Sequence, residues 1–310
     1  MPLVVVAIGG NSLVQSHQVG NIPEQFENAA IACTGIADVI ERDWDVVLTH
    51  GNGPQVGNVL LRVEMASHQI YPLPLDICDA DTEGGIGYML QQVLGNTLRR
   101  RGVERTVVTF VTQILVDEDD PAFQNPTKPI GPFFDEDVAE ERKQNRGWKM
   151  IEDAGRGWRR VVPSPQPLQI VEIEAIRRCV GDTMVPIAVG GGGVPVIRRD
   201  GDLVGVEAVV DKDLASALLG NVLGADTLLI STGVDQVQIR FNTPQAEPLG
   251  EVGRDEIRQS LAAGEFPAGS MGPKIRAALQ FLDGGGQRVI ITSPSLLLEA
   301  IDGEAGTRIV

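Results

Sequence analysis

Three glycine-rich turns, each directly after a short apolar run, constrain the fold of this chain most strongly. The apolar runs at 4–8, 46–49 and 186–189 end in Gly9-Gly10-Asn11-Ser12, His50-Gly51-Asn52-Gly53 and Gly190-Gly191-Gly192-Gly193. A glycine turn between a buried strand and a helix exposes backbone N–H groups, which bind phosphate or another small anion together with the helix dipole. Three such turns indicate a parallel-sheet enzyme that acts on phosphorylated or carboxylated small molecules.

The pattern along the chain alternates between β-type runs and helical runs. This alternation predicts a mainly parallel sheet with helices on both faces. Asn21 and Glu24 bracket Pro23 as a capping box, which predicts a helix start. Asp200-Gly201 predicts a hairpin turn. We expect strands at 46–49, 106–111, 185–189, 194–199, 203–210, 227–231 and 288–292, and helices at 21–42, 55–68, 82–101, 213–223, 254–263, 273–282 and 296–302.

Residues 116–167 interrupt this alternation with seven prolines. Long irregular insertions in compact domains usually form functional lids or disordered linkers. Five aromatic residues in this stretch (Phe123, Phe133, Phe134, Trp148 and Trp158) favour an ordered lid or subdomain. We place the boundary between two lobes near residues 201–206.

The charge balance limits the partners and the compartment. A formal net charge of −16 over 310 residues argues against a nucleic-acid or anionic-membrane partner. Cys33, Cys78 and Cys179 are odd in number and widely spaced, which indicates reduced thiols in a cytoplasmic protein rather than disulfides or a metal site. The chain enters a strand directly after Met1-Pro2, so we expect no signal peptide and no membrane span.

Three lysines are candidates for phosphate chemistry. Lys212 and Lys274 lie at predicted helix starts, where a cation opposes the helix dipole by about 0.3–1 kcal/mol. An anion bound at the helix start would pair with the lysine and with the free N–H groups, and would make the placement of the lysine favourable. Replacing either lysine should therefore reduce turnover, while the stability of the ligand-free protein stays unchanged or rises slightly. The alternative is an ordinary solvated surface lysine. Lys128 stands between Pro126 and Pro129, either as part of a functional lid or in a rigid turn.

Other polar residues have two interpretations. Asp213 could hold two lysines through charged hydrogen bonds, or it could be a helix-start acid, and Asp211 could be an N-cap. His50 and Cys78 complete no Ser/His/Asp or Cys/His constellation, so a chemical role is the weaker interpretation. The glycines at 190–193 either permit close packing or contact an anion, and we favour the anion. The chain has no Walker A pattern and only a misspaced dinucleotide fingerprint, which argues against P-loop enzymes and dehydrogenases.

Several longer motifs resemble those of the carbamate kinases, which are members of the amino-acid kinase superfamily. They read VAIGGNS at 6–12, THGNGPQVGN at 49–58, NPTKPIGPF at 125–133, AGRGWRRVVPSP at 154–165, VVDKDLAS at 209–216 and GSMGPK at 269–274. They occur in the expected order and cover essentially the whole chain. The resemblance implies one open three-layer αβα domain over 1–310. Its N-terminal lobe (1–205) would carry the carbamate site and the protruding subdomain (116–167), and its C-terminal lobe (206–310) would bind the nucleotide.

The resemblance also implies a homodimer, Mg²⁺ bound with ATP or ADP, and the reversible reaction of ATP and carbamate to ADP and carbamoyl phosphate. ATP would be formed during the breakdown of arginine or purine-derived nitrogen. The catalytic residues would be Lys128, Lys212, Asp213 and Lys274. The carbamate and phosphate groups would contact Gly9, Gly10, Asn11, Ser12, Gly51, Asn52, Gly53, Gly191 and Gly192. The nucleotide would lie near Asp211, Ser231, Thr232, Gly233, Asp235, Ser270 and Met271.

One segment departs from the family pattern. Asp79, Asp81 and Glu83 place three acids where small, apolar or amide residues are expected. We interpret them as a solvated helix start, with Asp81 as N-cap and Glu83 favoured by the dipole. If they instead face the acceptor site, their charge would disfavour an anionic acceptor. The alternatives to carbamate are then another small carboxylate or phosphate acceptor, or a ligand sensor without catalysis.

Overall fold

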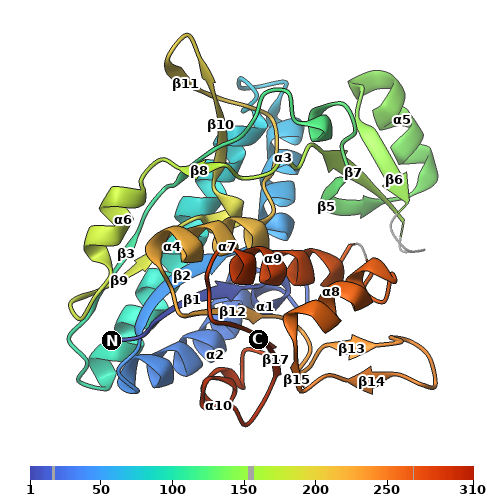
Figure 1. The fold of residues 1–310 in the computed structure, drawn as a ribbon. Helices are drawn as coiled ribbons and strands as arrows, with labels where there is room; N and C mark the ends of the chain where they lie inside the picture. The colour runs from blue at the N-terminus through green and yellow to red at the C-terminus, as the bar shows by residue number, and fades with distance from the viewer. Residues whose placement is uncertain (16–17, 153–156, 268) are drawn as a thin grey trace.

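The computed structural model describes residues 1–15, 18–152, 157–267 and 269–310 (Figure 1). Its first half contains β1 (Leu3–Ile8), α1 (Gly10–Leu13), α2 (Ile22–Glu41), β2 (Asp45–His50), α3 (Gly53–Ala66), α4 (Leu75–Arg100), β3 (Thr106–Thr109), β4 (Gln113–Leu115), η1 (Pro121–Phe123), β5 (Lys128–Phe134), α5 (Glu136–Arg146), β6 (Lys149–Glu152) and β7 (Trp158–Val162). Its second half contains β8 (Gln169–Ile170), α6 (Ile173–Cys179), β9 (Met184–Ile187), η2 (Gly190–Gly192), β10 (Val194–Arg199), β11 (Asp202–Gly205), α7 (Lys212–Leu223), β12 (Thr227–Ser231), β13 (Gln238–Ile239), β14 (Glu247–Pro248), β15 (Glu251–Val252), α8 (Arg254–Ala262), α9 (Met271–Asp283), β16 (Arg288–Thr292), α10 (Leu297–Asp302) and β17 (Thr307–Ile309).

The main sheet has eight strands in the order β15-β17-β16-β12-β1-β2-β9-β3. Its central strand β1 pairs in parallel with β2 on one side and with β12 on the other. The β16–β17 pair is antiparallel, whereas the other neighbours in this sheet run parallel. The sheet is therefore mainly parallel, as the alternating pattern predicted.

Both faces of the sheet are buried, as the side chains of β1 show. Val5 and Ala7 point into one core, which includes residues of α7 and α9. Val4, Val6 and Ile8 point to the opposite face, into a core that includes residues of α2 and α4. Successive side chains of a strand alternate between its faces, so a strand that is apolar throughout must be covered on both sides. Figure 1 shows these helices on either side of the sheet, and the three-layer α/β prediction is confirmed.

Helix boundaries match the predictions where a local capping signal exists. The Asn21–Glu24 capping box forms at the start of α2 as predicted. The prediction for α4 was wrong, because the helix begins at Leu75 after Pro74, not near residue 82. Asp81 is therefore an exposed residue inside a helix rather than its N-cap. No helix within the described ranges combines the length and apolar character that a membrane span requires.

A small subdomain protrudes from the main body (Figure 1, green). It consists of the antiparallel sheet β5-β7-β6 and helix α5. Strands β4 and β8, which lie just before and just after residues 116–167, join β10 and β11 in a second sheet. The subdomain contacts α3 at Gly57, where an added Cβ would lie 1.9 Å from Cα of Gly131. Two glycines thus allow the two backbones to meet.

Candidate active site

The carboxyl ends of β12, β1, β2 and β9 lie side by side at one edge of the main sheet. The N–H of Gly9 donates to the carbonyl of Ser231 at 3.1 Å, and the N–H of Gly51 donates to the carbonyl of Ile8 at 3.0 Å. An added Cβ on Gly51 would lie 3.1 Å from the nitrogen of Gly10. The three glycine turns of the sequence therefore meet where open α/β sheets bind their ligands.

Two lysines from different helices meet at one carboxylate beside these turns. Nζ of Lys212 lies 2.5 Å from Oδ1 of Asp213, and Nζ of Lys274 lies 3.0 Å from Oδ2 of the same residue. The Lys212 side chain also passes Gly51, since an added Cβ there would lie 3.5 Å from Cδ of Lys212. Asp213 thus holds both lysines, which was one of the two interpretations drawn from the sequence.

The electrostatics of this group follow from its burial. Burial alone would raise the pKa of the Asp213 carboxyl, but Lys212 and Lys274 outweigh it and hold that pKa well below its usual range. Burial lowers the pKa of Lys212 more than Asp213 raises it. Burial would also lower the pKa of Lys274, but Asp213 reverses the direction and raises it. The group carries two cations and one anion in a largely buried place, so it can accept further negative charge.

Lys128 reaches this region from the subdomain. Its Nζ lies 2.6 Å from Oδ2 of Asp211. Asp211 is the N-cap of α7, and its Oδ1 accepts the N–H of Asp213 at 3.0 Å. Burial would raise the pKa of Asp211, but Lys128 outweighs it and the pKa is lowered. The ion pair ties the first strand of the subdomain to the residue that precedes Lys212.

The residues predicted near the nucleotide lie at the ends of β12 and α9. Ser231 is buried, and its hydroxyl lies 3.4 Å from that of Ser12. The N–H of Thr232 donates to the carbonyl of Thr292 at 2.8 Å. Gly233, Asp235 and Ser270 are exposed, and Met271 packs partly buried against the core. The side chain of Asn11 and residues 154–156 of the AGRGWRRVVPSP motif lie outside the described part of the chain.

His50 and Cys78 are buried and do not have the properties of catalysts. Burial lowers the pKa of His50 to about 4, so its imidazole is neutral near pH 7. Burial raises the pKa of the Cys78 thiol to about 11 and that of Cys33 to about 12. A thiol with a raised pKa is a weak nucleophile. Cys33, Cys78 and Cys179 are all free.

The interpretation of the acidic segment as a solvated helix start was wrong, since α4 begins at Leu75 and only Asp81 of the three acids is exposed. Asp79 and Glu83 are 0 % and 1 % exposed, and they face the glycine turns from α4. The amide of Asn52 donates to Oδ1 of Asp79 and, at 2.9 Å, to the hydroxyl of Thr82. Glu83 accepts the N–H of Gly190 at 2.8 Å. The available signal was helical spacing, because Leu75, Cys78, Asp79, Thr82, Glu83 and Ile86 form one buried face of α4.

The third glycine turn is tightly packed against the second. An added Cβ on Gly191 would lie 2.4 Å from the amide nitrogen of Asn52. The N–H groups of Gly192 and Gly193 donate to the carbonyls of Val189 and Gly190, at 3.2 and 2.8 Å. Gly190, Gly191 and Gly192 are all buried. The geometry favours the close-packing interpretation of this turn, with its contact to Asn52 as the reason for glycine.

Comparisons with known proteins agree with this arrangement. The model of the Amino acid kinase family matches residues 2–293. The carbamate kinase of Thermococcus kodakarensis is 49 % identical over 314 residues, which cover 100 % of this chain and 99 % of that protein. The carbamate kinase-like protein YahI of Escherichia coli is 49 % identical over 312 residues, covering 99 % of this chain and 98 % of that protein.

The solved structures extend this similarity to three dimensions. Carbamate kinase from Giardia lamblia, bound to AMP-PNP, matches with a TM-score of 0.92 at 42 % identity and covers 100 % of this chain and 98 % of that chain. The same protein bound to citric acid matches with a TM-score of 0.94. The resemblance drawn from the motifs is thereby confirmed. This chain is a kinase of the amino acid kinase family and belongs, within it, with the carbamate kinases.

Proposed function

We propose that this protein is a carbamate kinase, which catalyses the reversible reaction ATP + carbamate ⇌ ADP + carbamoyl phosphate. One observation carries the proposal most directly: Asp213 joins Lys212 and Lys274 beside the glycine turns of β1 and β2. The two lysines of such a group can neutralise the negative charge on the equatorial oxygens of a phosphoryl group while it is transferred. The Thermococcus and Giardia relatives, both carbamate kinases, support the acceptor.

Phosphoryl transfer to carbamate requires little of the protein beyond positioning the substrates and neutralising negative charge. Carbamate is an anionic nucleophile, so it needs no general base to attack the terminal phosphorus of ATP. The P–O bond to ADP breaks as the bond to the carbamate oxygen forms. In this proposal Lys212 and Lys274 stabilise the transferring group, Asp213 orients them, and Lys128 approaches from the subdomain. Each role rests on charge and distance, which phosphoryl transfer requires.

The two substrates would occupy opposite sides of the lysines. We place carbamate and the phosphoryl group in the N-terminal lobe (1–205) and the nucleotide in the C-terminal lobe (206–310). The first group of contacts comprises Gly9, Gly10, Asn11, Ser12, Gly51, Asn52 and Gly53, whereas the packing of Gly191 and Gly192 leaves them out of it. The second comprises Asp211, Ser231, Thr232, Gly233, Asp235, Ser270 and Met271. The first group lies at the ends of β1 and β2, and the second lies at the end of β12 and at the starts of α7 and α9; these positions support the division.

Mg²⁺ would arrive with the nucleotide rather than occupy a site of its own. The described residues include no group of three or more His, Cys, Asp or Glu that could hold a metal ion. The carboxylates of Asp211 and Asp213 are already engaged by lysines. When bound to the ATP phosphates, Mg²⁺ supplies further positive charge to the β- and γ-oxygens.

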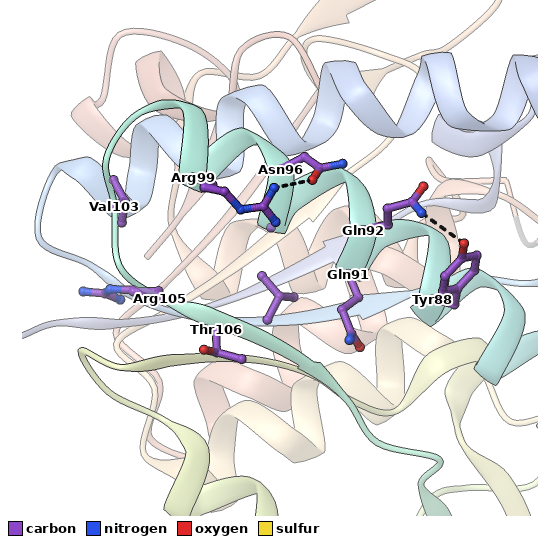
Figure 2. A pocket seen from close by; sticks show the side chains of 10 residues that line it. Tyr88, Gln91, Gln92, Asn96, Arg99, Val103, Arg105 and Thr106 are labelled. Carbon is purple, nitrogen blue, oxygen red and sulfur yellow. Dashed lines mark hydrogen bonds between the residues drawn. The ribbon is translucent and has the colours of Figure 1, made fainter.

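We propose a homodimer that forms at the open edge of the main sheet. Strand β3 ends the sheet, and beside it α4 carries an exposed Tyr88. A pocket of about 450 Å³ lies at this place. Figure 2 shows Tyr88, Gln91, Arg99 and Arg105 among the side chains that line it. Proteins commonly cover sheet edges, and a second copy would do so. Sedimentation analysis should find a dimer that Tyr88→Lys weakens; a monomeric wild-type protein would contradict this.

The setting of the reaction is also part of the proposal. The family resemblance supports a role in arginine or purine-derived nitrogen catabolism, with ATP formation as the useful direction. The three free cysteines support a reducing compartment, and we propose the cytoplasm.

The alternative is a kinase of the same fold that acts on another small carboxylate or phosphate acceptor. Buried Asp79 and Glu83 on the acceptor side are the observation that favours it. ATP consumption with a panel of acceptors separates the two: carbamate formed from bicarbonate and ammonia, a set of amino-acid carboxylates, and small phosphorylated acids. Turnover with carbamate alone supports the proposal, and faster turnover with another acceptor would replace it. A ligand sensor would show no turnover with any of them.

A further inference from the structure

Helix α3 starts with a residue that does not cap it. Asn52 occupies its N-cap position, where asparagine usually accepts an N–H of the first turn. Its side chain makes no such bond, and it donates instead to Asp79 and Thr82 of α4. Pro54 in the first turn has no N–H, so the helix start keeps the N–H groups of Gly53 and Gln55 unclaimed by Asn52. The start of α3 thus remains open to an anion.

A second acid of α4 holds the neighbouring glycine turn. Glu83 accepts the N–H of Gly190 at 2.8 Å with one carboxylate oxygen and the N–H of Thr112 at 3.1 Å with the other. The Thr112 hydroxyl in turn accepts the N–H of Val189 at 2.9 Å. Val189 has φ 55°, a left-handed conformation that costs a β-branched residue energy and persists only when its surroundings enforce it.

The two acids act on one structural unit. They lie four residues apart and therefore on one face of α4. Asp79 binds the Asn52 side chain, and Glu83 binds the turn whose Gly191 packs against that same side chain. Burying two carboxyl groups side by side costs free energy, and burial raises the pKa of both, so their presence calls for a compensating role.

We propose that Asp79 and Glu83 are positioning residues for the acceptor half of the site. Asp79 keeps the Asn52 side chain from capping α3, and Glu83 holds the strained turn at 189–193 against Asn52. Together they maintain a helix start whose N–H groups can bind the carboxylate of carbamate or the phosphoryl end of carbamoyl phosphate. This inference rests on the proposed function for its substrate, whereas the geometry concerns any small anion bound there.

Four variants test the inference by their separate effects on the two substrates. In Asp79→Ala, Asn52 can turn toward α3 and compete with the anion, so kcat/KM for carbamoyl phosphate should fall about 10–100-fold. In Glu83→Gln, one of the two backbone N–H groups loses its acceptor, so we expect kcat/KM for carbamoyl phosphate to fall by less than in Asp79→Ala. KM for ADP should stay within about twofold in both. Asp79→Asn should recover activity, because its side-chain oxygen can still accept from Asn52. Asp81→Asn, exposed on the same helix, is the matched control and should behave as wild type.

A double variant distinguishes positioning through Asn52 from general loss of structure. If Asp79 acts through Asn52, the variant Asn52→Ala/Asp79→Ala should have the same kcat/KM as Asn52→Ala alone. Losses that multiply, or equal rises in KM for ADP and carbamoyl phosphate, would overturn the inference. So would wild-type kinetics in Asp79→Ala.

Calorimetric binding of inorganic phosphate separates this inference from the proposed function. Phosphate should bind about tenfold more weakly to Asp79→Ala than to wild type, whichever acceptor the enzyme uses. Loss of phosphate binding in a protein that does not use carbamoyl phosphate would support the positioning role and refute the proposed substrate. Unchanged phosphate affinity in Asp79→Ala would overturn the positioning role even if the protein made ATP from carbamoyl phosphate.

Discussion

Lys274 of α9 and Asp213 of α7 form an ion pair of 3.0 Å across 61 residues of sequence. Asp213 is 3 % exposed, and its second oxygen binds Lys212. The pair therefore joins the two helices at the point where the glycine turns converge. In the proposed reaction, the two positive charges lie on one side of the phosphoryl group. The Asp213 carboxylate, which binds both lysines, fixes the distance between them.

Lys212→Met and Lys274→Met should each reduce turnover about 10²–10³-fold, because a charged contact to the transition state is worth about 2.7–4 kcal/mol. The helix dipole alone predicts that stability stays unchanged or rises slightly in these variants, but the structure predicts a loss for Lys212→Met. Lys212 is a buried partner of a buried carboxylate, so its removal should lower the free energy of unfolding by about 1–3 kcal/mol. Urea unfolding and turnover of the same variants check both effects. Near-normal turnover with lost stability would make these lysines structural.

Lys128→Ala should slow phosphoryl transfer and leave the affinity for ADP nearly unchanged, since Lys128 approaches from the subdomain on the side assigned to carbamate. The ion pair with Asp211 adds a second effect, because it connects the subdomain to the start of α7. Single-turnover rates and calorimetry with ADP measure the two quantities separately. Lys149→Ala, on an exposed position of the same subdomain, is the control. A comparable loss of ADP affinity would show that Lys128 serves the nucleotide.

Asp79 should make stability depend on pH near neutrality. Burial raises the pKa of Asp79 from its ordinary value of 3.8 to about 7; the hydrogen bond from Asn52 lowers this pKa, and the charge of Asp76 raises it further. Between these values the folded protein keeps a proton that the unfolded chain has released. The stabilisation is therefore complete below about pH 4 and is lost as the pH rises through 7.

Asp79→Asn removes this dependence. Relative to wild type, the variant should gain about 2.7 kcal/mol of unfolding free energy between pH 5 and pH 8, because about two pH units at about 1.36 kcal/mol each lie between pH 5 and the pKa of Asp79. Urea unfolding at the two pH values measures the difference, and Asp81→Asn should show none. A difference between variant and wild type that stays constant with pH would contradict a buried, neutral Asp79.

Two glycines inside helices should respond to alanine substitution with opposite changes in stability, because Gly57 of α3 contacts the subdomain and a Cβ added at Gly84 of α4 would contact nothing. Gly84→Ala in α4 meets no neighbouring atom and should stabilise the protein by about 0.5–1 kcal/mol, as alanine does in a helix interior. Gly57→Ala would press on the Gly131 backbone, so it should destabilise by about 1–3 kcal/mol and displace the subdomain that carries Lys128. Thermal unfolding and turnover compare the pair. Equal changes in stability for Gly57→Ala and Gly84→Ala would contradict a close contact between Gly57 and Gly131.

The sequence predicted those features whose signals are local. The strands at Thr227–Ser231 and Arg288–Thr292 have the predicted bounds, because turns flank a continuous apolar run in each. The capping box of α2 is likewise local. The convergence of the glycine turns followed from parallel pairing, which places strand ends at one edge.

The features that the sequence did not predict depend on distant partners. Asp79 and Glu83 have the composition of a solvated surface, and only the positions of Asn52 and Gly190 explain their burial. The same holds for Lys128 and Asp211, which are 83 residues apart. Strand β17 has only three residues and depends on pairing with β16 and β15. Such contacts arise from the packed fold, where tertiary context overrides local composition.

The proposed function is the transfer of a phosphoryl group between carbamoyl phosphate and ADP at this site. A coupled assay of ATP formation from ADP, Mg²⁺ and carbamoyl phosphate, with acetyl phosphate as the comparison donor, tests this function. We expect the enzyme to form ATP from carbamoyl phosphate well above the background rate without enzyme, and to form little ATP from acetyl phosphate. ATP at the background level, or a preference for acetyl phosphate, would contradict it.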